Sequence, residues 1–183
     1  LDSATYYNQK TIDVHYKLFG EKSLKMAYPY FQLGKIYLEQ KDWKQSLAYF
    51  RKALAIYQQY LGDKHPDIAT AYTYIARVYE KQKQYETALG YYQNALVSNI
   101  LDFNSLDYLD FPNPNTVRKN TFHRQKLFDA LIPKMTCLYK LYQSKKDIHY
   151  LKQAFQQLQY TQQLVSTFRH NIINDSDKHS FLH

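Results

Sequence analysis

The sequence predicts an all-α fold in which similar helical hairpins stack side by side as a solenoid. Three observations favour this fold class. The segment from Gly20 to Leu96 repeats itself with a fixed step of 42 residues, and a step of about 20 to 50 residues is typical of stacked repeats. Apolar residues recur at every third or fourth position within long segments, as in amphipathic helices. The 183 residues include only 4 glycines and 5 prolines, too few turn formers for a many-stranded sandwich or barrel.

The two copies of the repeat match in size and polarity along their length. Small residues, such as Gly34 and Ala76, occupy equivalent positions where helices must approach closely. So many matches at one offset indicate a true repeat. The matched pairs are Gly20 with Gly62, Ala27 with Ala69, Tyr30 with Tyr72, Leu33 with Ile75, Tyr37 with Tyr79, Trp43 with Tyr85, Leu47 with Leu89, Tyr49 with Tyr91, Ala53 with Ala95 and Leu54 with Leu96.

The repeat step divides the first half of the chain into helical units. Residues 1–19 read as the second helix of a truncated repeat, since Tyr7 and Ile12 precede Tyr49 and Leu54 by the same 42 residues. A glycine ends such a helix well because it adopts the left-handed conformation without steric cost. We expect one complete repeat at 20–61, with helices at 24–40 and 43–60, and a second at 62–97, with helices at 66–82 and 85–99.

The repeat pattern breaks after Val97. Prolines and Asx residues disfavour helix there, so we expect an insertion loop at 98–116. A divergent helix pair is expected at 117–174, with one helix at 117–143 and a second that begins after the cap Asp147. The residues 175–183 read as the start of a further helix. The loop either contributes to a binding surface or packs its own side chains over the repeat edge, namely Phe103, Leu106, Tyr108, Leu109 and Phe111.

Composition narrows the class of protein. The net charge of +8 fits an acidic partner, but the lysines and arginines are spread along the helices, which argues against nucleic acid. The sequence contains no run of about 18 apolar residues, which a membrane span would require. The single cysteine, Cys137, rules out an internal disulfide and is compatible with a reducing compartment, so we expect a cytoplasmic protein. Because the chain begins within a repeat, we expect it to be part of a longer protein.

Residues that could carry catalysis do not form a recognisable set. Cys137 lies within an amphipathic helix, where a thiol is ordinarily a small apolar filler, whereas a nucleophilic cysteine needs an exposed, electropositive setting. His65 precedes Pro66 as a turn or capping residue, without a second metal ligand at a fitting spacing. The sequence contains no Gly-rich phosphate loop. We therefore expect no enzyme activity, no cofactor and no metal in this chain.

The repeated positions resemble the signature of the tetratricopeptide repeat (TPR). A TPR usually has about 34 residues, and the 42-residue step, together with the turn from Leu61 to Ala69, resembles the long variant typified by kinesin light chains. The resemblance implies a TPR-type helical-hairpin solenoid, a right-handed superhelix, that ends in a divergent repeat. The positions that carry it are Tyr30, Leu33, Gly34, Tyr37, Ser46, Phe50 and Ala53, then Tyr72, Ile75, Ala76, Tyr79, Ala88, Tyr92 and Ala95.

The order of the segments resembles the TPR region that precedes a caspase-like CHAT domain in bacterial proteins. Two long repeats are followed by an insertion ending at Pro114, a helix from Leu127 to Lys134, and a segment that begins at Lys146. The resemblance implies a downstream CHAT peptidase domain that the array would sense for or inhibit. Pro133 departs from that family's pattern, which usually has a small residue there, and it would disturb the helix locally.

The resemblance also implies a concave groove lined by the first helix of each repeat. Lys35 and Arg77 are equivalent positions, so stacking would bring two cations together, suited to an extended peptide with an acidic side chain or a C-terminal carboxylate. The asparagines of the chaperone carboxylate clamp are missing, so that particular ligand is not implied. The residues carried over to the groove are Phe31, Gln32, Lys35 and Glu39, then Thr73, Tyr74, Arg77 and Lys81.

The sequence thus predicts a non-catalytic protein–protein interaction or regulatory module that binds a protein or peptide, with an acidic segment favoured. Two alternatives stay open. One is a structural spacer or self-association module, for which substitution of Lys35 and Arg77 together changes no binding. The other is a basic nucleic-acid-binding repeat, which would lose affinity for a polyanion steeply as the salt concentration rises.

Overall fold

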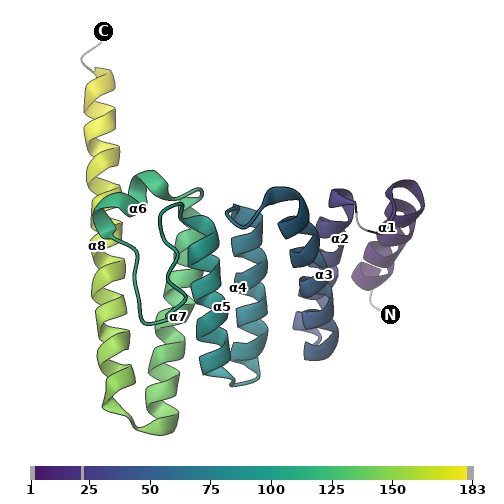
Figure 1. Ribbon diagram of the computed structural model, residues 1–183, viewed down its shortest axis with the longest axis horizontal. Coiled ribbons are helices and arrows are strands. Elements are labelled where there is room, and N and C mark those ends of the chain that lie inside the picture. Colours follow the sequence, from purple (N-terminus) through teal and green to yellow (C-terminus); the bar gives the residue numbers. More distant parts are fainter. Residues whose placement is uncertain (1–2, 22, 181–183) are drawn as a thin grey trace.

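The computed structural model describes residues 3–21 and 23–180 and confirms the all-α fold (Figure 1). Within those residues the regular structure is helical, apart from one isolated antiparallel bridge between Ile100 and Thr121. The elements are α1 (Ser3–Phe19), the short 3-10 helix η1 (Leu24–Met26), α2 (Ala27–Glu39), α3 (Trp43–Leu61), α4 (Pro66–Lys81), α5 (Tyr85–Asn99), α6 (Pro114–Asn120), α7 (Arg124–Lys145) and α8 (Ile148–Ser180).

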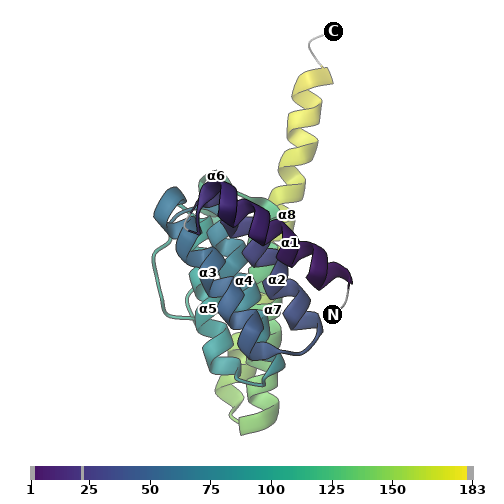
Figure 2. The same ribbon diagram turned by 90° about the vertical axis from the view of Figure 1, so that its right-hand side faces the viewer.

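Three antiparallel hairpins stack along the long axis of the molecule. The pairs α2 and α3, α4 and α5, and α7 and α8 form the hairpins, while α3 contacts α4 and α5 contacts α7 between them. Figure 1 shows α1 at one end of the stack and α8 at the other, and Figure 2 looks along the stack from the α1 end. The chain is therefore a helical-hairpin solenoid, in which each hairpin buries apolar surface against its neighbours.

The three hairpin turns use the same backbone device. Lys41, Lys83 and Lys146 have positive φ angles of 62°, 62° and 57°, a conformation that residues other than glycine adopt infrequently. In both regular repeats the residue after this lysine donates its amide to a carbonyl oxygen five residues earlier, at 2.9 Å. The third hairpin, which is divergent in sequence, thus ends its first helix with the same left-handed residue.

Helix starts are capped where the sequence predicts. The His65 side chain accepts a hydrogen bond from the Asp67 amide at 3.1 Å, so this histidine is a capping residue. Asp147 likewise accepts from the His149 amide at 2.9 Å before α8. Gly62, which follows α3, has a φ of 72°. Local sequence signals therefore place most of the helix boundaries.

Tyrosine rings and a close helix approach hold each hairpin together. The rings of Tyr37 and Tyr49 stack with centroids 5.5 Å apart, and the equivalent rings of the next hairpin, Tyr79 and Tyr91, stack at 5.3 Å. In the first hairpin, Gly34 lies directly against the ring of the fully buried Phe50. The small residue allows the two helices to approach, as the repeat pattern predicts.

The segment between α5 and α6 packs against the core. Phe103 is buried, and the ring of Phe111 stacks on that of Tyr160 in α8 with centroids 5.2 Å apart. Leu106 does not take part, since it is 69% exposed. The loop therefore packs over the repeat edge, which is one of the two roles expected for it. Its other expected role, in a binding surface, stays a prediction.

Two lysines from other parts of the chain form hydrogen bonds that fix this loop. The fully buried Lys134 of α7 donates from Nζ to Gln93 Oε1 at 2.7 Å and to the main-chain oxygen of Asp110 at 3.1 Å. Lys64 donates to the main-chain oxygens of three residues in or before the loop, at 2.7 to 2.9 Å. The main-chain oxygens at the C-terminal end of α5 have no donor within the helix, and Lys64 supplies one.

The second half of the chain departs from expectation in two places. The single helix expected at 117–143 is wrong, because α6 ends at Asn120 and α7 begins at Arg124. The break lies beside the bridge of Thr121 with Ile100, where the Asn99 side chain also donates to the main-chain oxygen of His123 at 2.8 Å. These contacts with the end of α5 replace helix hydrogen bonds in the gap.

The second departure concerns the end of the chain. A separate helix starting at 175–183 was expected from the Asx residues there, but α8 runs unbroken from Ile148 to Ser180, and residues 181–183 lie outside the described residues. Asparagine and aspartate cost a helix interior only about 0.7 kcal/mol each relative to alanine, whereas proline costs about 3 kcal/mol. Asx residues without glycine or proline are therefore a weak signal for a helix boundary.

Candidate functional site

Two adjacent cavities lie where α2, α4 and α7 meet. The larger has a volume of about 460 Å³ and the smaller about 290 Å³. Both are lined by Lys35 of α2 and by Tyr74 and Arg77 of α4, so these three side chains form a wall common to the two. We call the two cavities together the groove. Its position on the first helices of the hairpins is the one that the family resemblance implies for a binding surface.

All eight residues expected at the groove line one cavity or both. Glu39 and Lys81 lie at the larger cavity, together with the common wall. The smaller cavity is lined by Phe31, Gln32 and Thr73. Equivalent positions of two repeats are thus close in space although they are 42 residues apart in the chain. Whether these residues contact a ligand stays a prediction.

Two of the eight residues are buried and contact other residues of the protein. Phe31 is 8% exposed, and the centroid of its ring lies 5.4 Å from the ring centroid of Phe50 and 5.0 Å from that of Tyr74. Thr73 is 3% exposed, and its hydroxyl donates to the Ala69 main-chain oxygen at 2.9 Å. Both side chains therefore support the groove from beneath more than they offer contacts to a ligand.

The common wall presents two cations on one aromatic ring. Lys35 Nζ lies 5.9 Å from the centroid of the Tyr74 ring, and the Arg77 guanidinium carbon lies 4.7 Å from it. Neither cation takes part in an ion pair with another described residue. Stacking on the ring orders the two side chains without neutralising them. Their charges are available to an acidic ligand.

The sequence did not indicate the part of the groove that α7 contributes. Lys126 and Asp129 line the smaller cavity, and Pro133 lines the larger. The spacing of these residues, i, i+3 and i+7, is that of one helix face, and this was the available signal. The divergence of the third hairpin from the repeat pattern hid it. Further lining residues not expected from the sequence are Tyr28, Leu38, Lys41, Trp43, Thr70, Glu80 and Tyr92.

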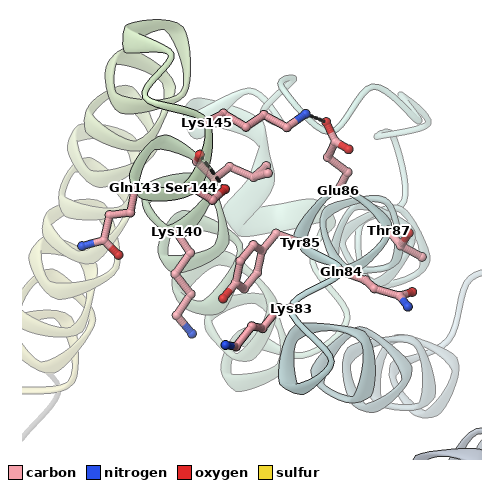
Figure 3. A pocket seen from close by; sticks show the side chains of 10 residues that line it. Lys83, Gln84, Tyr85, Glu86, Thr87, Lys140, Gln143, Ser144 and Lys145 are labelled. Atoms are coloured by element: carbon pink, nitrogen blue, oxygen red, sulfur yellow. Dashed lines mark hydrogen bonds and ion pairs between the residues drawn. The ribbon is translucent and has the colours of Figure 1, made fainter.

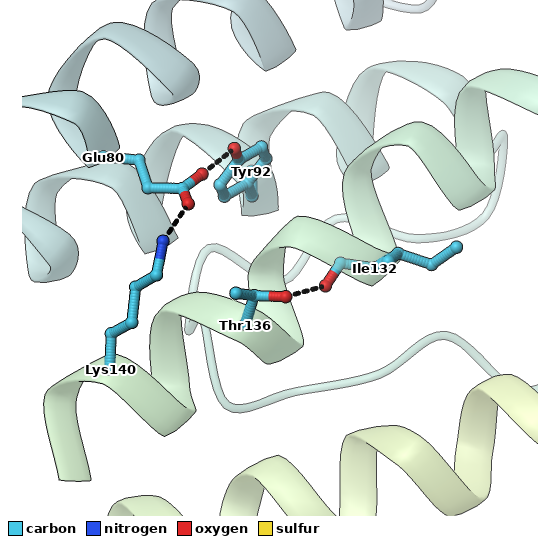
Figure 4. A network of polar contacts seen from close by, with 5 residues as sticks. All are labelled: Glu80, Tyr92, Ile132, Thr136 and Lys140. Carbon is cyan, nitrogen blue, oxygen red and sulfur yellow. Dashed lines mark hydrogen bonds and ion pairs between the residues drawn. The ribbon is translucent and has the colours of Figure 1, made fainter. Parts of the chain in front are cut away.

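Glu80, at the rim of the larger cavity, is already neutralised by the protein (Figure 4). Its carboxylate accepts from the Tyr92 hydroxyl at 2.9 Å and pairs with Lys140 Nζ of α7 at 2.6 Å. The hydrogen bond to Glu80 raises the pKa of Lys140, so this lysine stays protonated. The other charged residues that line the groove are the cations Lys35, Lys41, Arg77, Lys81 and Lys126 and the anions Glu39 and Asp129.

A third and larger cavity, of about 630 Å³, lies between the start of α5 and the end of α7 (Figure 3). Its cations include Lys83, Lys140 and Lys145. Lys145 is paired with Glu86 at 2.6 Å, and both side chains are about half exposed. Surface pairs of this kind contribute little free energy. This cavity is less well suited to an acidic ligand than the groove, whose cations form no ion pair with any residue that the structure describes.

The structure gives no support for catalysis by Cys137 or for a metal site among the described residues. Cys137 is fully buried, and burial, followed by the nearby Glu80 carboxylate, raises the pKa of its thiol to about 12. A thiol in that state is protonated near neutral pH and is not a nucleophile. The described residues contain no cluster of three histidine, cysteine or acidic side chains that could hold a metal ion. None of the described helices has the length and apolar character that a membrane span requires.

The fold and the groove define a helical-repeat protein of the hairpin-solenoid class. Residues 22–96 match the family model described as tetratricopeptide repeat. The two regular hairpins therefore match tetratricopeptide repeats.

A solved structure supports the same fold for a longer part of the chain. The chain is similar to the crystal structure of BtubC (BKLC) from P. vanneervenii, with a TM-score of 0.63 and 15% sequence identity. The match covers 88% of this chain and 57% of that chain, so the chain spans little more than half the length of BtubC. No curated protein matches the sequence. TPR arrays are generally non-catalytic modules for protein interaction.

Proposed function

We propose that this chain is a non-catalytic interaction module that holds an extended acidic segment of a partner protein in the groove of α2, α4 and α7. The observation that carries the proposal is the pair of unpaired cations, Lys35 and Arg77, on the ring of Tyr74. Hydrogen bonds between such cations and a carboxylate are stronger than those between neutral groups, and the fork of arginine binds carboxylates in two-point fashion.

The electrostatics of the whole groove support an acidic ligand. Five cations line the two cavities against three carboxylates, and one of these carboxylates, Glu80, is paired with Lys140 from outside them. Two cavities on either side of one cationic wall suit alternate side chains of an extended peptide, which point to opposite sides of its backbone. A single small molecule would use only one of the cavities.

We expect the double variant K35A/R77A to lose about a hundredfold or more in affinity for an acidic peptide, because each of the two lost hydrogen bonds to a charged group contributes about 1.5–3 kcal/mol. The probe is the tightest acidic peptide recovered from a displayed random library on the wild-type chain. Its affinity for wild type and variant is measured by fluorescence anisotropy with a labelled synthetic copy.

The matched control is K44A/K152A, which removes the same net charge from exposed positions of α3 and α8 that line neither cavity. This control should bind as the wild type does. If the library yields no acidic peptide, or if K35A/R77A binds it as tightly as the control, the proposal is wrong. Equal losses in both double variants, with a steep salt dependence on a polyanion, would support the nucleic-acid alternative.

Self-association is tested on the same samples by sedimentation velocity. A concentration-dependent dimer that K35A/R77A leaves intact, without peptide binding, would favour the spacer or self-association alternative. Regulation of a CHAT peptidase domain stays an implication of the family resemblance. In that setting the acidic segment would come from the regulated domain or from the partner that the array senses.

A further inference from the structure

Pro133 lies in the interior of α7, nine residues after the first residue, Arg124, and yet the helix continues to Lys145. Proline has no main-chain N–H, so it cannot donate to the main-chain oxygen four residues earlier, which belongs to Asp129. This oxygen therefore lacks its regular helix donor. An acceptor without a donor is unfavourable unless a solvent molecule or a ligand satisfies it.

The position of this oxygen is set by the residues at its two ends. Asp129 lines the smaller cavity and Pro133 lines the larger. Residues four apart lie on one face of a helix, one above the other, and the oxygen of the first points along the axis toward the second. The acceptor thus lies on the groove side of α7, where the two cavities meet.

The neighbouring side chains make a main-chain acceptor distinctive there. Lys35, Tyr74 and Arg77 form the common wall of the two cavities, and Lys35 and Arg77 can only donate. The carboxylate of Asp129 accepts a hydrogen bond from Gln125 at 3.1 Å. An extended peptide carries main-chain N–H groups as well as acidic side chains. The common wall can satisfy the acidic side chains, and the oxygen of Asp129 could satisfy one of the N–H groups.

We propose that Pro133 is a specificity-determining residue, because it opens the main-chain oxygen of Asp129 as an acceptor for an N–H group of the bound peptide backbone. This inference rests on the proposed binding of an acidic peptide in the groove. The cations then select the charge of the ligand, and the freed oxygen fixes its register along α7. The missing N–H of Pro133 thus has two consequences: it weakens α7, and it leaves the main-chain oxygen of Asp129 as an acceptor.

The test is the variant P133A, which returns an N–H to position 133 and closes the helix hydrogen bond on Asp129. Two effects of opposite sign are expected. The melting temperature rises by about 5 °C or more, since a helix interior gains a hydrogen bond and loses a proline. The affinity for the peptide selected on the wild-type chain falls by about threefold to tenfold, the usual effect of one lost hydrogen bond.

A matched control separates stability from binding. Gly90 lies within α5 with open space around the position of an added Cβ, so G90A also strengthens a helix. It should raise the melting temperature and leave the affinity unchanged. A variant P133S serves the same purpose as P133A if the alanine chain folds poorly, because serine also restores the N–H.

The register is tested with copies of the peptide in which one backbone nitrogen at a time is methylated. One methylation should weaken binding to the wild type and cost much less in P133A, giving a coupling between the two changes. The inference alone is overturned if the wild type binds the peptide and P133A binds it equally well, or if no methylation couples to P133A. Absence of peptide binding by the wild type would instead overturn the proposed function.

Discussion

Raising the pH from about 7 to about 9.5 should increase the free energy of unfolding of the wild-type chain by about 3 kcal/mol more than it does for the variant K134M. The cause is the side chain of Lys134, which is fully buried between α7 and the loop. Burial lowers the pKa of this lysine from 10.5 to about 7, even though the nearby Asp107 and Asp110 act in the opposite direction.

The sign follows from counting protons in the two states. Above pH 7 the buried lysine has lost its proton, whereas in the unfolded chain it keeps the proton up to about pH 10.4. The unfolded state therefore binds more protons throughout this interval, so stability rises with pH by up to about 1.4 kcal/mol per unit. Below the folded-state pKa both states are protonated, and the contribution no longer changes. The neutral amine still donates to Gln93 and to Asp110.

Other groups also change the stability of the chain in or near this pH interval. They are present in both the wild type and K134M, so the comparison of the two chains removes their contribution. Burial also lowers the pKa of Lys64, with an effect of the same sign. The raised pKa of Cys137 makes stability fall above about pH 9, and that of Tyr57, at about 12, makes it fall above about pH 10.

The measurement is urea unfolding followed by circular dichroism at a series of pH values for both chains. Subtracting the two curves leaves the contribution of Lys134. Methionine fills a similar volume without a charge, so the variant should fold. Curves that stay parallel over the whole interval would contradict the assignment of a neutral amine at this position.

The variant G34A should be less stable than the wild type by about 1–3 kcal/mol, the usual cost of adding atoms to a packed core. A Cβ at position 34 would lie 2.5 to 2.9 Å from three carbons of the Phe50 ring. Phe50 is fully buried, and its ring contacts Phe31 and Tyr74. The ring cannot retreat without moving the residues beneath the groove, so peptide affinity should fall as well.

The control G90A adds the same methyl group to the interior of another helix. An added Cβ there meets no atom within 4 Å, so the higher helix propensity of alanine should stabilise the chain by about 0.5–1 kcal/mol. The two variants thus have expected effects of opposite sign. Thermal and urea unfolding of both chains measure the difference. A G34A chain as stable as G90A would show that the approach of α2 and α3 is not close enough to require glycine.

Local patterns were sufficient for the regular part of the fold. The turn between α3 and α4 illustrates the reason, because Gly62, His65 and Pro66 each act on the backbone within a few residues. The repeat step then placed Lys35 beside Arg77, since equivalent positions of stacked units must be neighbours. The eight residues expected at the groove came from the family resemblance, and all of them line it.

Contacts between distant segments lay beyond such patterns. The break before α7 depends on the bridge of Thr121 with Ile100 and on the Asn99 side chain, and none of these contacts has a local signature. The expected helix at 117–143 failed for this reason. The loop that carries Asp110 likewise depends on a lysine from α7.

The sequence by itself determined the helical hairpins, their order and the two cations of the groove, because helix periodicity, capping and a constant repeat step are properties of the chain. Only the tertiary structure decided that Phe31 and Thr73 support the groove from beneath, that α7 contributes Asp129 and Pro133 to it, and that Lys134 is buried. Burial and partner choice depend on which surfaces pack together, and a divergent hairpin carries no repeat from which that packing could be inferred.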